Sequence, residues 1–500
     1  MKPLKEKAMP SFMREREAYR KITTALARRR KGATVADISA ATALPLSQVR
    51  ELLPRAADEF SGRLEVTESG EIRYSFPRGF VSRYRGFGAA LRRFSAAFLS
   101  GLGTFSVLVF KVWIMLMLVG YFALFMAIAF ASLFLSVAAN SRSSDNRRGG
   151  GLYIGPGIFN LIWRLWFYSE LTRSLDRHYE AGRRPARENK RPLHRAIFSF
   201  VFGEEDPNKG WAAAEKKAII AYIQAHRGVI SQPEVMALTG RDVSAAEETI
   251  MACCAEFGGS PEATAEGALV YRFDELLLRA DTADRSFSGL SAPLQRLKKF
   301  SDNPKNMNVW FGIINTVNLF FGSYFLYNAF NTGIIATPEQ FNAASRIYAV
   351  AYLLFGYIAA NPLPLIGVGL GLVPLVFSLL FWLVPALRFR REKRENEHIK
   401  LRNLKRLGFR HIWERPLEVE SGAIKSDAPE CRPRNLPAAQ DRVIKEMGAW
   451  SIPDVEINPQ GVTLYSFKEL EREKRSLEKY RSGISGEQSA LGKTVFDSEA

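Results

Sequence analysis

The residues of this chain that could take part in metal or redox chemistry are few and poorly spaced for it. The three cysteines are Cys253, Cys254 and Cys431, and the first two are neighbours on one expected helix. The histidines are scattered through basic or helical stretches at His178, His194, His226, His398 and His411. Zinc sites and iron–sulfur clusters need roughly four such ligands at matched spacing. We therefore expect no metal and no cofactor.

Phosphate-binding loops and other local catalytic signatures are also missing from the sequence. The glycines at 149–151 follow two arginines in the run SRSSDNRRGGG, which lacks the Lys and the Ser or Thr of a phosphate loop. Such a run is typical of a linker. No dinucleotide fingerprint or zincin motif occurs. We therefore predict no catalytic residue and no enzyme activity.

Three side chains could contact a nucleic acid or a protein partner: Gln48, Arg50 and Arg55. They lie on a helix for which Ser47 is a plausible N-cap. Arg and Gln are suited to base edges and phosphates. Neighbouring acids and Pro54 within the same helix oppose that use. Binding of DNA through this segment is thus the less favoured of the two interpretations.

An internal repeat connects this segment with two others. The stretch 59–76 reads EFSGRLEVTESGEIRYSF and the stretch 256–273 reads EFGGSPEATAEGALVYRF, so both fit EFxG, seven residues, then GxxxYxF. A third GxxxYxF stands at 461–467, and the intervals from 70 to 267 and from 267 to 461 are 197 and 194 residues. The shared residues are Gly70, Tyr74, Phe76, Gly267, Tyr271, Phe273, Gly461, Tyr465 and Phe467. Alternate residues of a strand share one face, so we expect the rings to pack on helices.

Each of the first two copies follows three expected helices, and three helices with a two-stranded wing make a winged helix. These helices are predicted at 19–29, 34–42 and from Ser47 in the first copy, and at 217–226, 232–238 and 244–257 in the second. The third copy is predicted to be trimmed, with one helix at 438–447 before the wing. In winged helices that bind DNA the third helix enters the major groove. The helix at 244–257 carries three glutamates and no basic residue, which favours protein contact.

Two long apolar blocks, 94–140 and 308–387, predict an integral membrane protein. The 500-residue chain has a formal net charge of +18 and a pI of about 9.8, and its basic clusters flank these blocks, where anionic lipid headgroups are the nearest anions. The first 90 residues are polar and basic without the apolar core of a cleavable signal. We therefore expect the N-terminus to stay in the cytoplasm.

The first block is long enough for one span or for a hairpin of two. Basic residues stand on both sides of it, so the positive-inside rule favours a hairpin with both ends cytoplasmic. Lys111 and the lack of polar turn residues oppose a reversal in lipid. In the second block, 309–330 and 366–387 are expected spans, and the apolar piece at 348–360 before Pro362 is expected to be a half-helix. Asn315, Thr316, Asn318 and Asn361 are expected to bond between helices.

These features predict a mainly α membrane protein with about four transmembrane helices and two or three small α+β winged-helix-like cytoplasmic domains. The expected divisions are a first domain at 1–93, a block at 94–140, a linker with an interfacial aromatic segment (152–168) at 141–195, a second domain at 196–292, a second block at 308–388, and a basic stalk helix with the truncated third domain at 389–500.

At ATVADISAATALPL, GRLEVTESGEIRYSFPRG, SRSSDNRRGGG and FSFVFGEEDPN the sequence resembles a family of uncharacterised membrane proteins of cyanobacteria and other bacteria with relatives in plant chloroplasts. The likeness runs from about Tyr19 to the Glu-rich helix after Phe467. It implies no established activity. Some plant relatives carry a label of iron–sulfur cluster biosynthesis, which the three cysteines here do not support.

We expect the protein to be a scaffold or adaptor of the cytoplasmic (inner) membrane that displays its winged-helix modules for contact with a protein partner or with itself. A membrane-tethered DNA-binding regulator is the alternative, and a transporter or channel component is less favoured, because Lys111 is the one ionisable group within the spans. The expected partners are membrane lipids and proteins. Nucleic acid is a lesser candidate, through the first domain.

Overall fold

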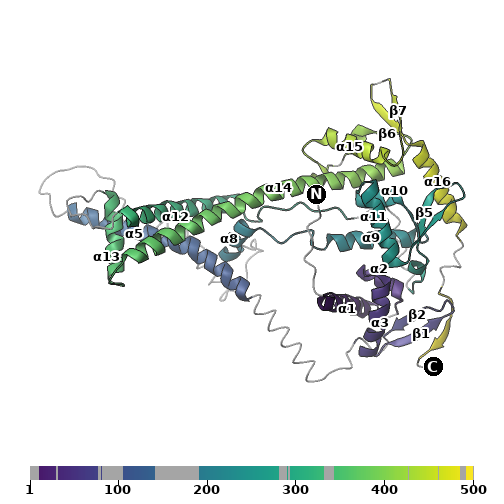
Figure 1. The fold of residues 1–500 in the computed structure, drawn as a ribbon, viewed down its shortest axis with the longest axis horizontal. Coiled ribbons are helices and arrows are strands. Elements are labelled where there is room, and N and C mark those ends of the chain that lie inside the picture. The colour runs from purple at the N-terminus through teal and green to yellow at the C-terminus, as the bar shows by residue number, and fades with distance from the viewer. Residues whose placement is uncertain are drawn as a thin grey trace, which may run out of the picture. The chain divides into compact units, whose positions relative to one another are not determined.

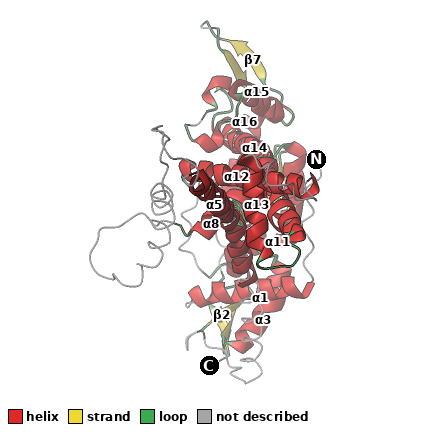
Figure 2. Cartoon of the chain, turned by 90° about the vertical axis from the view of Figure 1, so that its left-hand side faces the viewer, coloured by secondary structure: helices red, strands yellow, loops and turns green. Residues whose placement is uncertain are grey.

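The computed structural model describes residues 11–29, 32–76, 80, 105–140, 191–280, 290, 293–331, 343–425, 427–459, 461–484 and 491–498. Figure 1 shows the chain as a ribbon, with many of its helices and strands labelled. The chain forms two compact units. The modular unit contains Met1–Arg93, Asp206–Lys298 and Arg394–Ala500, and the apolar unit contains Phe94–Glu205 and Lys299–Lys393. The structure is mostly helical, with strands only in small sheets (Figure 2).

Module 1 is the N-terminal part of the modular unit. Its elements are α1 (Ser11–Arg28), α2 (Val35–Thr42), α3 (Leu46–Glu59), β1 (Arg63–Thr67) and β2 (Ile72–Ser75). β1 and β2 form an antiparallel hairpin, and Ala33 makes an isolated bridge to Tyr74 on the far side of β2. The C-terminal strand β9 (Thr494–Asp497) pairs with the free edge of β1. Module 1 therefore includes residues from both ends of the chain.

Module 2 repeats this order of elements. It consists of α9 (Trp211–Ala225), β3 (Val229–Ser231), α10 (Gln232–Thr239), α11 (Val243–Phe257), β4 (Ser260–Ala263), β5 (Leu269–Arg272) and the short 3-10 helix η4 (Asp274–Leu277). The strand order is β3-β5-β4. The expected helices at 217–226, 232–238 and 244–257 thus correspond to helices of the structure.

Module 3 has the same strand order, β6-β8-β7. Its elements are β6 (Val419–Glu420), the 3-10 turns η7 (Ser421–Ala423) and η8 (Pro429–Cys431), α15 (Leu436–Gly448), β7 (Asp454–Ile457), β8 (Thr463–Ser466) and α16 (Lys468–Gly483). The long helix α14 (Val373–Glu414) precedes β6 as α9 precedes β3. The segment expected to be a basic stalk is therefore the first helix of module 3 from Arg394 onward.

Three helices among the described residues of the apolar unit are long and apolar enough to cross a membrane: Phe105–Leu135, Lys305–Asn331 and Leu365–Glu414. The first includes a π-helical turn, η1 (Leu116–Gly120), and continues as α5 (Tyr121–Asn140). The second is α12 (Lys305–Asn331), and the third joins the π-helical η6 (Leu365–Leu372) to α14. Two shorter helices, α8 (Leu193–Phe202) and α13 (Ala343–Gly356), belong to the same unit.

The reversal favoured for the first block is absent from its described part. Residues 105–140 are helical throughout. Their middle, 114–131, has few polar side chains that could bond the backbone groups that a turn would expose. The described residues contain three candidate spans, and the expected total of about four stays a prediction. The expected half-helix at 348–360 overlaps α13, which ends before Pro362. The interfacial segment expected at 152–168 lies outside the described residues.

Amides hold the spans of the apolar unit together. Asn315 Nδ2 donates to the carbonyl of Ser378 at 3.0 Å, and Asn318 Nδ2 donates to the carbonyl of Leu118 at 2.8 Å. Leu118 lies in the π-helical turn η1. The expected bonds between helices are confirmed for these two amides, whereas Thr316 Oγ1 bonds within its own helix to Gly312.

Glycines lie at a close contact between α12 and the third candidate span. A Cβ added to Gly371 would lie 2.9 Å from the Cα of Leu326, and one added to Gly322 would lie 3.0 Å from the backbone nitrogen of Leu375. Small residues at such a crossing let two backbones approach closely.

Substituting Gly371→Leu should therefore push the two helices apart and destabilise the apolar unit by about 1–3 kcal/mol, the usual cost of overpacking. Gly369→Leu is the matched control, because a Cβ at Gly369 meets nothing within 4 Å. Thermal unfolding of the full chain in detergent, followed by circular dichroism, would measure both. Equal melting temperatures for the two variants would contradict this account of the crossing.

Candidate functional site

The contacts that join the three modules form the candidate site.

The repeated motif residues show how each module is built. In each module the tyrosine of GxxxYxF pairs with a residue of the short strand or bridge that follows the first helix: Tyr74 with Ala33, Tyr271 with Ile230 and Tyr465 with Val419. The following phenylalanines, Phe76, Phe273 and Phe467, are buried in one core shared by the modules. The glycine that ends the EFxG pattern leaves room for this phenylalanine. A Cβ at Gly62 would clash with the ring of Phe76, and one at Gly259 would clash with the ring of Phe273.

The turn glycine of each wing has the same conformation. Gly70, Gly267 and Gly461 have φ of 77°, 85° and 78°, a region that L side chains rarely adopt. Each amide donates to the carbonyl three residues earlier at 2.9 Å. The sequence motif thus reports the geometry of a turn and a core, not a binding surface.

Gln48, Arg50 and Arg55 all lie on α3 but do not form an open basic surface. Arg50 Nη2 lies 3.1 Å from Glu275 Oε2 of module 2, and Arg55 Nη1 lies 2.8 Å from Glu15 Oε1 of α1. Gln48 is half-buried. A cleft of about 440 Å³ beside Arg55 is lined by acids that include Asp58 and Glu59. These carboxylates would repel the phosphate groups of DNA at this face of α3.

An acid at the start of the second helix provides the first contact between modules. Asp37 and Glu234 stand 197 residues apart (from 37 to 234), the same interval as Gly70 and Gly267. Each accepts a 3.0 Å bond from the backbone nitrogen three residues earlier, Asp37 from Thr34 and Glu234 from Ser231. This is half of a capping box, and it fixes the carboxylate at the helix N-terminus.

Both acids are fully buried, and both are met by an arginine from the following module. Arg279, just after η4 of module 2, has its Nε 3.5 Å from Asp37 Oδ1, and the amide of Ala280 donates to Asp37 Oδ2 at 2.9 Å. Arg481 of α16 in module 3 binds Glu234 with two bonds of 2.9 and 2.7 Å. The same device therefore joins module 1 to module 2 and module 2 to module 3.

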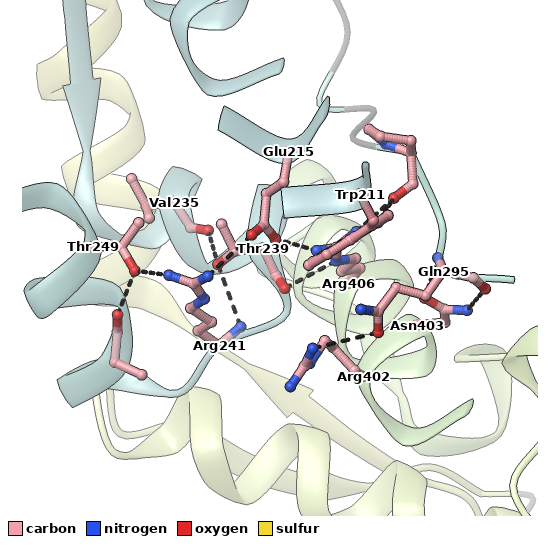
Figure 3. A network of polar contacts seen from close by, with 12 residues as sticks. Trp211, Glu215, Val235, Thr239, Arg241, Thr249, Gln295, Arg402, Asn403 and Arg406 are labelled. Atoms are coloured by element: carbon pink, nitrogen blue, oxygen red, sulfur yellow. Dashed lines mark hydrogen bonds and ion pairs between the residues drawn. The ribbon is translucent and has the colours of Figure 1, made fainter. Parts of the chain in front are cut away.

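A second buried pair joins module 2 to α14, as Figure 3 shows. Arg406 of α14 pairs with Glu215 of α9, and both side chains are at most 4% exposed. Its Nε and Nη1 donate to the carbonyls of Thr239 and Pro293 at 2.9 and 2.7 Å, and its guanidinium lies 4.4 Å from the Trp211 ring centroid. All sides of the guanidinium are therefore occupied.

Further polar contacts surround this pair. Arg241 Nη2 donates to Glu215 Oε2 at 3.0 Å, so the carboxylate has two arginine partners. Asn403 and Gln295 exchange two bonds of 3.0 and 2.9 Å. Gly240 (φ 67°) lies so close to the carbonyl of Arg402 that a Cβ would be 2.6 Å from it. The backbones of module 2 and α14 are therefore in close contact at Gly240.

Burial and charge act in opposite directions on this pair. Burial raises the pKa of Glu215, and the guanidinium groups of Arg241 and Arg406 limit that rise. Burial lowers the pKa of Arg406 to about 10, which still leaves it charged at neutral pH. The arrangement is a charged pair with its hydrogen bonds filled, the form in which a buried ion pair is tolerated.

The described residues include few groups suited to metal binding or to nucleophilic chemistry. Among them, no group of three or more His, Cys, Asp or Glu side chains could hold a metal ion. Burial raises the pKa of the Cys253 thiol to about 12, which disfavours the reactive thiolate. Burial likewise lowers the pKa of His226, which stacks on Tyr222 at 3.9 Å.

Comparison with known proteins finds one distant likeness. The chain is 25% identical over 413 residues to "Uncharacterized protein At5g03900, chloroplastic" of Arabidopsis thaliana, which covers 77% of this chain and 70% of that protein. This fits an uncharacterised family with chloroplast members. No protein-family model and no solved structure matches.

The sequence analysis missed the residues that join the modules, chiefly Glu215, Arg406 and Arg481. A signal for the acids was present, because TVAD at 34–37 and SQPE at 231–234 both fit the [ST]-x-x-[DE] capping pattern at the repeat interval. The arginines carried no such signal, since their partners lie more than 150 residues away in the chain.

We predict that Arg406→Met will destabilise the modular unit by about 3–5 kcal/mol, because it leaves one oxygen of the buried Glu215 carboxylate and two backbone carbonyls without this donor. Arg410→Met on the same helix removes an exposed pair with Glu414 and should cost less than about 0.5 kcal/mol. Pulse proteolysis of the full chain in detergent against urea would measure both. A small effect at Arg406 would show that the pair does not hold module 2 to α14.

Proposed function

We propose that this chain is an integral membrane scaffold whose three winged-helix-like modules form one body at the membrane surface and contact a protein partner there. The support for winged helices is the shared order of a helix, a short strand or bridge, a second helical segment, a third helix and a hairpin. The support for a single body is the chain of buried Arg–carboxylate contacts at Asp37, Glu234 and Glu215.

One observation carries the choice of a protein partner over DNA. The third helix of module 2, α11, presents Glu247, Glu248 and Met251 to solvent, and Met251 is 48% exposed. A helix that enters the major groove needs cations near phosphates, whereas an acidic face with an exposed methionine suits a basic protein surface. The corresponding helix of module 1 has its Arg50 and Arg55 turned to carboxylates.

The single body also constrains the membrane topology. Module 1 precedes the first candidate span, and modules 2 and 3 follow it, yet β9 at the C-terminus pairs with β1 of module 1. In the proposed single body the three modules therefore lie on the same side of the membrane. The basic residues on both sides of the first block favour the cytoplasmic side.

We predict that single cysteines at three exposed positions, Ser47→Cys in module 1, Ser244→Cys in module 2 and Glu456→Cys in module 3, will react with an impermeant maleimide from the same side of the membrane. Sealed vesicles of both orientations would be compared. The protein without these substitutions is the control for the native thiols, of which Cys253 and Cys431 are buried. Labelling of Ser47→Cys from the opposite side would refute the single body.

The partner can be tested with the full chain in its membrane. A photo-crosslinking amino acid at Ala252 on α11 should capture one stoichiometric protein with a basic surface, and Glu247→Lys with Glu248→Lys should reduce the capture at least tenfold by charge repulsion. Glu418→Lys, an exposed acid outside α11, is the matched control. Recovery of the protein alone and monomeric would count against the scaffold.

A membrane-tethered DNA-binding regulator is the alternative function. It requires the full chain to bind DNA in a salt-sensitive and saturable way, with loss of that binding in Arg50→Ala. Transport has less support, because the amides of Asn315 and Asn318 bond to neighbouring helices. Substitution of Lys111 and Asn361 without any change in a measured flux would exclude it.

A further inference from the structure

A cleft of about 730 Å³ lies where the wing of module 2 meets module 3. One wall is the turn of the module 2 wing, with Glu266. The other wall consists of Trp450 and Ser451, which follow α15, together with one face of α16. On α16 the lining residues Glu469, Arg472, Glu473 and Ser476 are spaced three and four apart, so they share one side of the helix.

The two walls are fastened to each other beside the cleft. Thr264 Oγ1 and Ser476 Oγ form a buried bond of 2.7 Å. Lys479 Nζ donates to Glu266 Oε1 at 3.1 Å, and Tyr480 bonds Glu262. The cleft is therefore a built feature of the interface between modules 2 and 3.

Two buried polar atoms in the cleft lack a partner among the described residues. Glu473 Oε2 accepts a 2.9 Å bond from Trp450 Nε1, but Glu473 Oε1 is buried without any donor. Ser451 is 3% exposed, and its Oγ is also buried and unpaired. Proteins rarely leave such atoms unsatisfied. Both residues line the cleft.

We propose that this cleft binds one organic cation, an ammonium or a guanidinium, with the half-buried Glu473 as the carboxylate anchor and Ser451 Oγ as a second acceptor. An ammonium has three donors and no acceptor, so it suits two unpaired oxygens. The lining carries three carboxylates against one arginine, and the Trp450 ring can add cation–π attraction. The cation would be a free diamine or a lysine or arginine side chain; only the second source rests on the proposed scaffold function.

The anchor also makes binding depend on pH. Burial raises the pKa of Glu473 to about 7, the bond from Trp450 opposes the rise, and the charge of Glu234 adds to it. The other charged groups of the cleft are Glu266, Glu469 and Arg472. A cation binds the carboxylate form, so affinity should rise with pH through 7 and should fall up to tenfold per pH unit below it.

The test uses the full chain in detergent and cadaverine as the probe, measured by isothermal titration calorimetry at pH 8. Cadaverine should bind saturably at one site, and Glu473→Gln should weaken that binding at least tenfold. Glu478→Gln, an exposed acid on the same helix outside the cleft, should change it less than twofold. Binding at pH 6 should be about tenfold weaker than at pH 8.

Two further measurements keep the result decisive. Glu473→Gln should melt at nearly the same temperature as the parent at pH 4 and higher at pH 8, because a raised pKa in the folded state costs stability once pH exceeds the unfolded value of 4.5. If that variant fails to fold, Ser451→Ala should still weaken cadaverine binding severalfold. A capped Gly-Lys-Gly peptide that binds while cadaverine does not would assign the site to a protein side chain, and the reverse would assign it to a free diamine.

The proposal is overturned if neither probe binds saturably, or if binding survives unchanged in Glu473→Gln. Because cadaverine needs no protein partner, its failure is distinguishable from failure of the scaffold function. Loss of the crosslinked partner with intact cadaverine binding would leave the cation site standing alone.

Discussion

The modular unit depends on burying charge between segments that are far apart in the chain. Arg406 and Glu215 are 191 residues apart in sequence and almost fully buried together, and Arg481 and Glu234 are 247 apart. Removing such ions from water costs several kcal/mol each. The structure offsets this cost by giving each guanidinium backbone carbonyls as well as a carboxylate. Apolar residues at these positions could give equal stability, but apolar contacts are less selective. A buried carboxylate at a helix end requires an arginine partner, so the pairs specify which segments meet.

The three modules depend on one another, because each takes elements or contacts from distant parts of the chain. Module 1 takes its outer strand, β9, from the last residues of the chain, and module 3 takes its first helix from the end of α14. Each wing is short, and a two-stranded hairpin is marginally stable alone. The shared core, which includes Phe76, Phe273 and Phe467, therefore forms only when three separate segments meet. A fragment cut at the apparent domain boundaries would lack part of its sheet or core.

Local rules in the sequence were enough to locate the elements. The glycines of GxxxYxF require a positive φ, and alternation places Tyr and Phe on the core face, so the wings could be placed without a structure. The amides of Asn315 and Asn318 could be assigned to contacts between helices, because polar side chains within apolar helices need hydrogen-bond partners. The continuous helix at 105–140 was harder, because flanking charge argued for a hairpin while local polarity argued against a turn. Long-range pairing of Arg279, Arg406 and Arg481 was beyond the sequence, since exposed and buried arginines look alike.

The long helix α14 contributes residues to both the apolar unit and the modular unit. α14 leaves the apolar unit at Lys393 and enters the modular unit at Arg394 without interruption, and Arg406, three turns later, is held on all sides by module 2. A shift of this helix along its axis would have to break the pair with Glu215 or carry module 2 with it. The pair with Glu215 therefore fixes module 2 to the same helix that contains the third candidate span.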